Sequence, residues 1–246
     1  MHAVSCSFDV LRWHAASTRL ADEAAWRAWA QGTLAPADLP DVPPDVSFLP
    51  ALQRRRLGLL SRLFFAAAWP LLDDAAHCPL VLVSHDGEIN RGFELWSALY
   101  GTGDVSPTSF GLSVHNALAG QWSMARGDMS EHTALAADEE ALEIGILEAC
   151  GLLREGAEHV LLVFADEALG AQYDVRGVSR PPFAHALAMV LAAGERFRLT
   201  RQAPQAPENT PDWGALAFVR QHYLGHARWR QDYRRSSWHW EKTCGA

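Results

Sequence analysis

Two short apolar runs constrain the fold of this chain more than any other feature of its sequence. Residues Pro79–Ser84 and His159–Phe164 are apolar almost throughout, which is typical of strands buried on both faces of a sheet. His132–Ala137 can form a third strand. Apolar residues at helical spacing predict helices around them, at Leu52–Ala67, Glu88–Tyr100, Leu112–Arg126 and from Asp138 to Gly156. This alternation predicts an α/β fold with a mixed, mainly parallel sheet covered by helices.

The two ends of the chain extend this pattern. Ala3–Arg12 reads as a strand and Thr18–Ala30 as a helix, and a proline-rich loop follows between Gly32 and Pro50. Near the other end, Phe183–Leu191 and Arg196–Arg201 flank Ala193-Gly194-Glu195 and predict an antiparallel pair. We expect one domain over residues 1–246, in which 203–246 form a C-terminal helical extension that includes a helix at Asp212–Tyr223.

Charge and cysteine usage exclude several classes of function. The chain has 246 residues and a formal net charge of −8, so it repels nucleic acid and anionic membrane surfaces. The basic runs Arg54–Arg56 and Arg234-Arg235 are local exceptions that an acidic partner can use or that solvent can cover. The cysteines are widely spaced and form no CxxC pair, so we expect neither disulfides nor a zinc site: Cys6, Cys78, Cys150 and Cys244. No apolar run is long enough for membrane insertion and no leader is recognisable, so we expect a cytoplasmic protein.

Local motifs give little support for independent catalysis. Ser84-His85-Asp86 places three catalytic residue types side by side, but consecutive residues at a strand end point in different directions. Gly101-Thr102-Gly103 is expected to be a turn. The acids Asp138-Glu139-Glu140 suit acid/base chemistry, but they also suit the first turn of a helix, where the dipole favours negative charge. The histidines form no H-E-x-x-H motif, so a zinc enzyme has little support.

Two stretches resemble the β-ketoacyl synthases of the thiolase superfamily. In that family an S-P loop leads into a helix that carries an asparagine and an A-G step, and Val105–Gly127 matches it with Ser106-Pro107, Asn116 and Ala119-Gly120. Leu153–Glu167 is similar to the helix end, strand and turn found further along the family's chain. The resemblance covers residues 1–200 and implies the first half of the thiolase-like fold.

The resemblance also implies that the family's nucleophile is absent. Counting without gaps from either stretch places the nucleophilic cysteine, normally in T-A-C-x-S, at Glu139. A glutamate there keeps the charge that a helix start favours but cannot carry an acyl thioester. The family's histidine motifs, H-G-T-G-T and N-x-x-x-G-H-x-x-G, are also missing, and Gly225-His226 is only a distant echo of the second. No catalytic residue and no cofactor are therefore expected.

A half-length synthase without its cysteine resembles the chain-length-factor subunits of type II systems, especially those of aryl polyene clusters. The resemblance implies a non-catalytic subunit that forms a heterodimer with a ketosynthase in fatty acid or polyketide biosynthesis, shapes its acyl tunnel and meets acyl carrier protein transiently. Bulky residues after the second buried strand would then line the tunnel or interface, and small ones would allow close approach: Phe93, Trp96, Phe110, Asn116, Ala117, Gly120 and Trp122. Aromatic residues at this spacing are also common in ordinary cores.

Two alternatives remain open at this point. One is a module that binds acyl carrier protein or acyl chains alone. The other is a small hydrolase or decarboxylase that uses Glu139 or Ser84. Co-purification with a ketosynthase separates the first hypothesis from both, and turnover by the lone chain favours the last.

Overall fold

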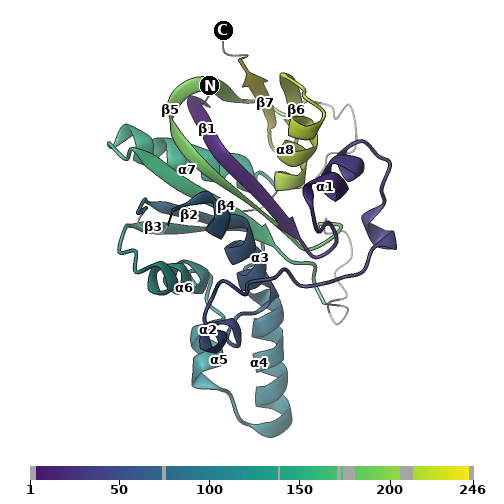
Figure 1. Cartoon of the computed structure of the whole chain (residues 1–246), viewed down its shortest axis with the longest axis vertical. Helices are drawn as coiled ribbons and strands as arrows, with labels where there is room; N and C mark the ends of the chain where they lie inside the picture. Colours follow the sequence, from purple (N-terminus) through teal and green to yellow (C-terminus); the bar gives the residue numbers. More distant parts are fainter. Residues whose placement is uncertain are drawn as a thin grey trace.

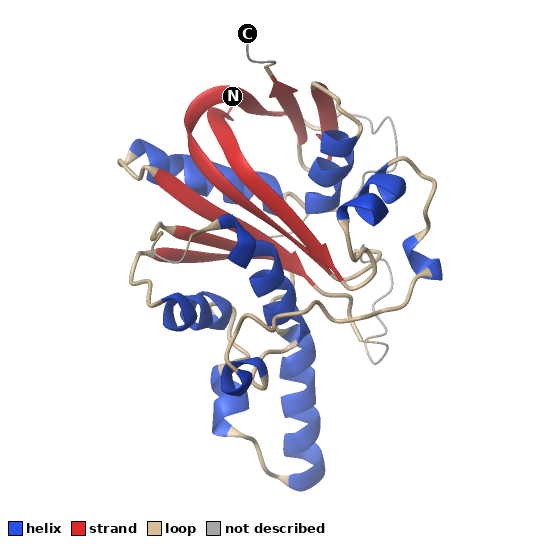
Figure 2. Ribbon diagram, in the orientation of Figure 1, coloured by secondary structure: helices blue, strands red, loops and turns tan. Residues whose placement is uncertain are grey.

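The computed structural model describes residues 4–73, 76–137, 139–170, 173, 181–205 and 213–243. These residues form one sheet with helices on both faces (Figures 1 and 2). The elements in chain order are β1 (Val4–Ser17), α1 (Glu23–Ala30), the 3-10 turn η1 (Pro36–Asp38), α2 (Ala51–Arg54), α3 (Leu59–Ala68), the 3-10 turn η2 (Trp69–Leu71), β2 (Leu80–Ser84), α4 (Ile89–Thr102), α5 (Pro107–Gly111), α6 (Ala117–Arg126), β3 (His132–Ala136), α7 (Ala141–Arg154), β4 (His159–Asp166), β5 (His185–Gln202), α8 (Gly214–Tyr223), β6 (Arg228–Asp232) and β7 (Ser237–Lys242).

The sheet confirms the mixed α/β fold predicted from the sequence. Its order is β3-β2-β4-β5-β7-β6, and β1 pairs with β5 outside this path. Pairing is parallel within β3-β2-β4 and antiparallel elsewhere. More pairs of neighbouring strands are antiparallel than the alternation of strands and helices in the sequence indicates, because β1, β5, β6 and β7 all pair in the antiparallel direction.

Each face of the sheet has its own core. Alternate residues of β2 and β4, such as Val83 and Leu162, pack with α7, α8 and α1. Their neighbours, such as Leu82 and Val163, pack with α3 and α6. Burial on both faces explains why these strands are apolar throughout.

The antiparallel pair expected at residues 183–201 is wrong, because β5 continues through it as one strand. Phe8 of β1 pairs with Phe197, whereas the next residue, Asp9, pairs with Ala192. The segment 193–196 is thus a bulge opposite β1, and Asp9 Oδ1 accepts a hydrogen bond from the Arg196 N–H at 2.9 Å. Because Gly194 has no side chain, it can lie close to Asp9 in this bulge. In the sequence alone, the same glycine looks like a turn residue.

The C-terminal segment also differs from the expected helical extension. Its helix is α8, but residues 228–242 form the antiparallel hairpin β6–β7, and β7 pairs with the second half of β5. Trp229 and Trp240 stack with ring centroids 5.0 Å apart. Aromatic residues alternating with charged ones suit a half-buried hairpin, and burial of the tryptophans decides the structure here.

Two predicted helices are interrupted. The helix expected over Leu52–Ala67 breaks into α2 and α3 at Leu57-Gly58, and the one expected over Leu112–Arg126 begins only at Ala117. Gly58 lies against the Arg91 guanidinium, where an added Cβ would come within 2.8 Å of its nitrogen. Close contact with the start of α4 therefore accounts for the first break.

Candidate functional site

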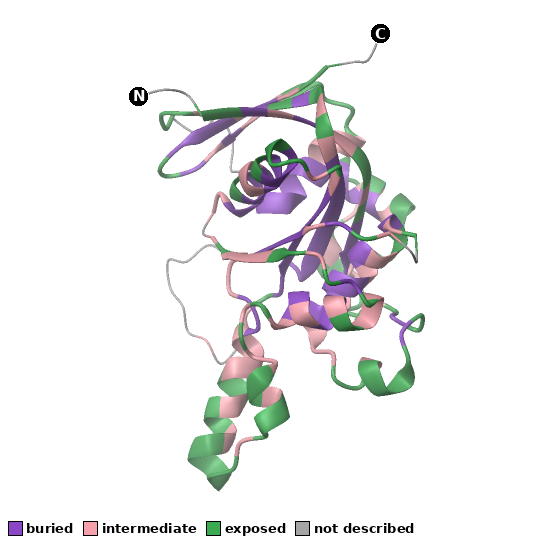
Figure 3. Cartoon of the chain, turned by 90° about the vertical axis from the view of Figure 1, so that its left-hand side faces the viewer, coloured by how far each residue is buried: buried purple, intermediate pink, exposed green. Residues whose placement is uncertain are grey.

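Helix α4 extends away from the sheet and carries an uncovered aromatic face. None of its residues is buried, as the absence of purple along it in Figure 3 shows. Phe93, Trp96 and Tyr100 follow one another at helical spacing, and Trp96 is 60% exposed. Phe110 on the neighbouring α5 is 63% exposed. Phe93, Trp96, Tyr100 and Phe110 are thus exposed apolar side chains on two adjacent helices, and we name them the aromatic arm.

A cavity lies at the base of this arm. It has a volume of about 360 Å³ and is bounded by the first turns of α4, the segment before α6 and Tyr173. Phe93 and Trp96 line it together with His115, whose Nε2 donates to the Leu135 carbonyl of β3 at 2.9 Å. The Phe93 and Tyr173 rings lie 5.0 Å apart. The structure therefore brings the first two tunnel candidates, Phe93 and Trp96, together at one cavity.

Hydrogen bonds fix the base of α4 to the sheet. Asn90 donates from Nδ2 to the Ala168 carbonyl and accepts from the Gly170 N–H, both at 3.0 Å. The Tyr173 hydroxyl donates to the Ile89 carbonyl at 2.8 Å. The loop after β4 thus holds the first turn of α4, and the exposed aromatic residues project from a rigid support.

A second anchor of the same turn is the buried Glu88. The Ser61 hydroxyl donates to Glu88 Oε1 and Arg91 Nε donates to Oε2, each at 3.0 Å. The carboxylate of this buried acid is therefore satisfied at both oxygens. Helix α3 and helix α4 are linked through it.

The Ser84-His85-Asp86 run does not form a catalytic triad. The Ser84 hydroxyl donates to Asp166 Oδ1 at 3.0 Å and accepts from the Gly87 N–H at 2.7 Å. His85 Nδ1 lies 2.9 Å from Asp86 Oδ1, so its imidazole is not the base of Ser84. Ser84 is 1% exposed and serves to close the turn after β2.

Two acids at the end of β4 have raised pKa values. Burial raises the pKa of Asp166 to about 6, against the hydrogen bonds it accepts from His85 and Ser84. Burial also raises the pKa of Glu167 to about 7, against its hydrogen bond with Asn90. Asp166 thus holds the turn after β2, and Glu167 holds the first turn of α4.

Glu139, where motif spacing predicts the family's cysteine, lies at the start of α7 beside the C-terminal hairpin. Its Oε2 accepts a hydrogen bond from the Arg234 N–H at 3.4 Å. The next acid, Glu140, accepts from the Trp238 indole at 2.9 Å and from Arg201 at 3.3 Å. The helix start that would carry a thiolate in a synthase is therefore covered by the tail of the same chain.

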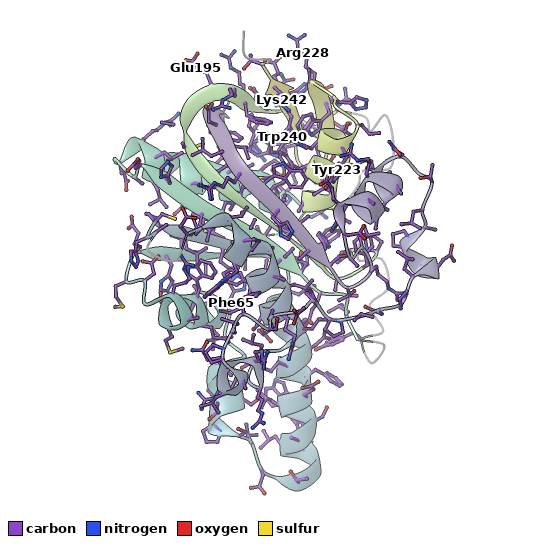
Figure 4. The ribbon with its side chains drawn as sticks, viewed as in Figure 1. Phe65, Glu195, Tyr223, Arg228, Trp240 and Lys242 are labelled. Carbon is purple, nitrogen blue, oxygen red and sulfur yellow. The ribbon has the colours of Figure 1, made fainter. Side chains whose placement is uncertain are left out.

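One turn further, Glu143 is buried against the same hairpin. It accepts from the Tyr233 hydroxyl at 3.0 Å and from the Trp240 indole at 3.2 Å. Burial raises the pKa of Glu143 to about 7, although both donors lower it. Trp240, labelled in Figure 4, also lies 5.7 Å from the ring of Phe218 on α8. Glu139, Glu140 and Glu143 thus act as anchors for the tail.

The remaining candidates on α6 divide into surface and core. Asn116 is exposed at the helix start, and Ala117 and Gly120 are half-buried. A Cβ added to Gly120 would meet no atom within 4 Å, so space for a close neighbour remains there. Trp122, however, is 2% exposed and packs on Phe64 of α3 at a ring distance of 5.6 Å. The ordinary core reading therefore holds for Trp122, and we do not include it in the interface.

The described residues provide neither a metal-binding cluster nor a membrane-spanning helix. No group of three or more histidine, cysteine or acidic side chains there is placed to hold a metal ion. Nor is any helix in that part of the chain long and apolar enough to cross a membrane.

Comparison with known families decides the family of this chain. The model for the beta-ketoacyl synthase N-terminal domain matches residues 26–241. The chain belongs to the β-ketoacyl synthase family. No curated protein gives a significant match.

Solved structures show that this family member has the thiolase-like fold. A chain of a ketosynthase in complex with its chain length factor from Xenorhabdus doucetiae matches with a TM-score of 0.84 at 23% identity, covering 96% of this chain and 100% of that one. The ishigamide ketosynthase/chain length factor matches with a TM-score of 0.64 at 16% identity over 80% of this chain and 68% of that one. A type II ketosynthase in complex with its acyl-carrier protein matches with a TM-score of 0.59 at 17% identity, covering 88% of this chain and 72% of that one.

Sequence reasoning missed the residues that support these sites. Glu143 sits beside the apolar stripe of α7, and only contact with a hairpin from the far end of the chain explains it. Tyr173 and Asn90 join segments that are distant in sequence. The one available signal was Asp166-Glu167, two acids directly after a buried apolar strand.

Proposed function

We propose that this chain is a non-catalytic chain-length-factor subunit, which pairs with a ketosynthase in type II fatty acid or polyketide biosynthesis of the aryl polyene kind and shapes its acyl tunnel. The aromatic arm carries the proposal. Phe93 and Trp96 stand on a rigid base, line a cavity and remain 36% and 60% exposed. Exposed apolar patches of this kind mark protein interaction sites.

The start of α7 supports a non-catalytic role. Glu139 replaces the expected nucleophile and is tied to the hairpin at Arg234. Ser84 is 1% exposed, and its hydroxyl donates to the buried Asp166 rather than to a histidine. Neither residue named in the hydrolase alternative therefore has the neighbours that nucleophilic or acid/base catalysis needs.

The interface that we propose includes β3 and the exposed face of α6. Strand β3 lies at an edge of the sheet, and its residues are exposed or half-buried. Gly120 leaves open space on α6 for a partner to approach closely. We place the resulting pair in the cytoplasm.

Acyl carrier protein is the transient partner in this proposal. The segment from α2 to α3 presents a cavity of about 380 Å³ lined by Arg54, Arg55 and Arg62. This basic surface contrasts with the net charge of −8 and suits an acidic partner. Arg55→Glu should weaken carrier protein binding to the pair about tenfold. Arg198→Glu, the same charge change at another exposed arginine, should leave binding unchanged.

Co-expression with the ketosynthase encoded beside this chain tests the proposal. We expect a stable heterodimer in size-exclusion chromatography and condensation activity only from the pair. A well-behaved monomer that ignores every ketosynthase offered contradicts the proposal. Turnover by the isolated chain would favour the hydrolase or decarboxylase instead.

A further inference from the structure

A third cavity, larger than the two described above, lies away from the aromatic arm. It has a volume of about 1050 Å³ and lies between the end of β1, the proline-rich loop after α1, η2 and the last turn of α8. Tyr223, labelled in Figure 4, marks the α8 side. This volume is at the upper end of the range of ligand pockets in proteins.

One wall of this cavity is the edge of a strand. Consecutive residues of β1, from Trp13 to Ser17, line it. Side chains of a strand alternate between the two faces of the sheet, so a cavity that touches every residue in turn faces the backbone edge. Strand β1 pairs only with β5 in the described sheet, which leaves its other edge without a strand.

The register identifies the backbone groups that face the cavity. The Thr18 N–H donates to the Ala184 carbonyl at 3.2 Å, across from β5. Backbone groups alternate between the two sides of an antiparallel strand, so those of Ala16 and His14 also point to β5. The N–H and C=O groups of Trp13, Ala15 and Ser17 point to the open edge. Among described residues, no backbone hydrogen bond on that side is formed by them.

The other walls suit uncharged, apolar side chains. Phe48 and Trp69 line the cavity and stack with ring centroids 4.9 Å apart, and Pro43 and Pro44 lie on the loop that covers it. The charged side chains that line the cavity already have partners within the chain. Arg19 pairs with Asp41 at 3.2 Å and Arg27 with Glu23 at 2.7 Å, while Asp22 accepts from the Ala25 N–H at 2.8 Å and Asp45 from the Ser47 N–H at 2.9 Å. The cavity thus offers hydrogen bonds to a backbone and aromatic surface to side chains, and its charged groups are already engaged.

We propose that this cavity binds an extended, uncharged segment of a partner polypeptide, which joins the sheet as an additional strand beside β1. Backbone hydrogen bonds to Trp13, Ala15 and Ser17 hold the segment, and its alternate apolar side chains pack on Trp69 and Phe48. Strand addition to an open sheet edge is a general mode of peptide recognition. The site is independent of the aromatic arm, so a ketosynthase on the arm leaves it open.

Blocked hexapeptides in which threonine alternates with valine, isoleucine, leucine or phenylalanine test this site on the full chain. We expect at least one to bind and to slow amide hydrogen exchange at Trp13 and Ala15 at least about tenfold in NMR spectra. Ala16, already bonded to β5, should change little. A panel that does not bind overturns the proposal. Binding that leaves the Ala15 amide exchanging freely also overturns it, because the peptide then uses the aromatic walls alone.

A proline substitution supplies the matched variant. Ala15→Pro removes an N–H that faces the open edge, a position where strands tolerate proline. We expect this variant to fold and to lose peptide binding at least about tenfold. Unchanged affinity in a folded Ala15→Pro chain contradicts strand addition. If the variant unfolds, the exchange measurement on the unmodified chain decides.

Discussion

The indole N–H of Trp240 on β7 donates a 3.2 Å hydrogen bond to Oε1 of Glu143, a buried carboxyl on α7. The Tyr233 hydroxyl donates to the other oxygen of the same group at 3.0 Å. Glu143 of α7 therefore holds both the turn that joins β6 and β7, at Tyr233, and the middle of β7, at Trp240. The tail closes over the start of α7 through this contact.

The first prediction concerns the pH dependence of stability. Burial raises the pKa of Glu143 from 4.5 to about 7, so the folded chain binds this proton more tightly than the unfolded chain does. Stability is therefore lost as pH rises from about 4.5 to about 7, by an amount of order 3 kcal/mol for this group. Glu143→Gln should remove that part of the pH dependence in denaturant titrations.

Asp166 and Glu167 also have raised pKa values and act in the same direction. Because both remain in the variant, the difference between the two pH profiles reports Glu143 alone. Parallel profiles for the two proteins would show that folding does not raise the pKa of Glu143.

The second prediction separates the aromatic arm from the core. Trp96 is 60% exposed, so Trp96→Ala should change the free energy of unfolding by less than about 0.5 kcal/mol. Trp122 is 2% exposed, so Trp122→Ala should cost about 3–5 kcal/mol. Thermal and denaturant unfolding of the isolated chain measure both.

The third prediction follows the aromatic arm into the product. In the assembled pair, Phe93→Ala or Trp96→Ala should lengthen the polyene or fatty product, since a bulky stop is removed from the tunnel. Mass spectrometry of the products measures this, with pair assembly checked by chromatography. Products of unchanged length from an intact pair would restrict these side chains to assembly.

The fourth prediction concerns Glu139. Glu139→Cys should not produce acyl transfer or an acyl adduct in the isolated chain, because the family's histidines are absent and the hairpin covers this position. Glu139→Gln should lower the free energy of unfolding by only about 0.3–1 kcal/mol, which is what an acidic side chain contributes in the first turn of a helix. Intact-mass measurement after incubation with acyl thioesters checks the first claim, and an acyl adduct on the native chain would contradict it.

The fifth prediction compares two glycines of α7. A Cβ at Gly145 would lie 2.5 Å from Val83 Cγ2 and 2.9 Å from Leu162 Cδ1, so Gly145→Ala should destabilise the chain by about 1–3 kcal/mol. Gly151 has no atom within 4 Å of an added Cβ, so Gly151→Ala should stabilise by about 0.5–1 kcal/mol. Equal effects would show that α7 does not approach the sheet as closely as described.

The sequence predicts those parts of the fold in which local pattern and burial agree. The apolar runs that became β2 and β4 are buried on both faces, and the stripe of α7 around Ile146 faces the sheet as expected. Local pattern is insufficient where long-range pairing decides. Gly194 reads as a turn but fits a bulge against Asp9, nearly the whole chain away.

The candidate site shows the same division. The position of Glu139 follows from motif spacing, and the exposure of Phe93 and Trp96 follows from α4 extending away from the sheet. Trp122 has similar spacing but faces α3, and no pattern within its own helix distinguishes the two situations. Packing partners from other segments make the difference.

The pairing of β1 with β5 has a consequence for how this protein is made. Ser17 pairs with His185 and Val4 pairs with Arg201, so β1 pairs with residues that lie far from it along the chain. Pairing between such distant segments is slow to form. During synthesis, β1 therefore stays without its partner strand until the residues of β5 have left the ribosome.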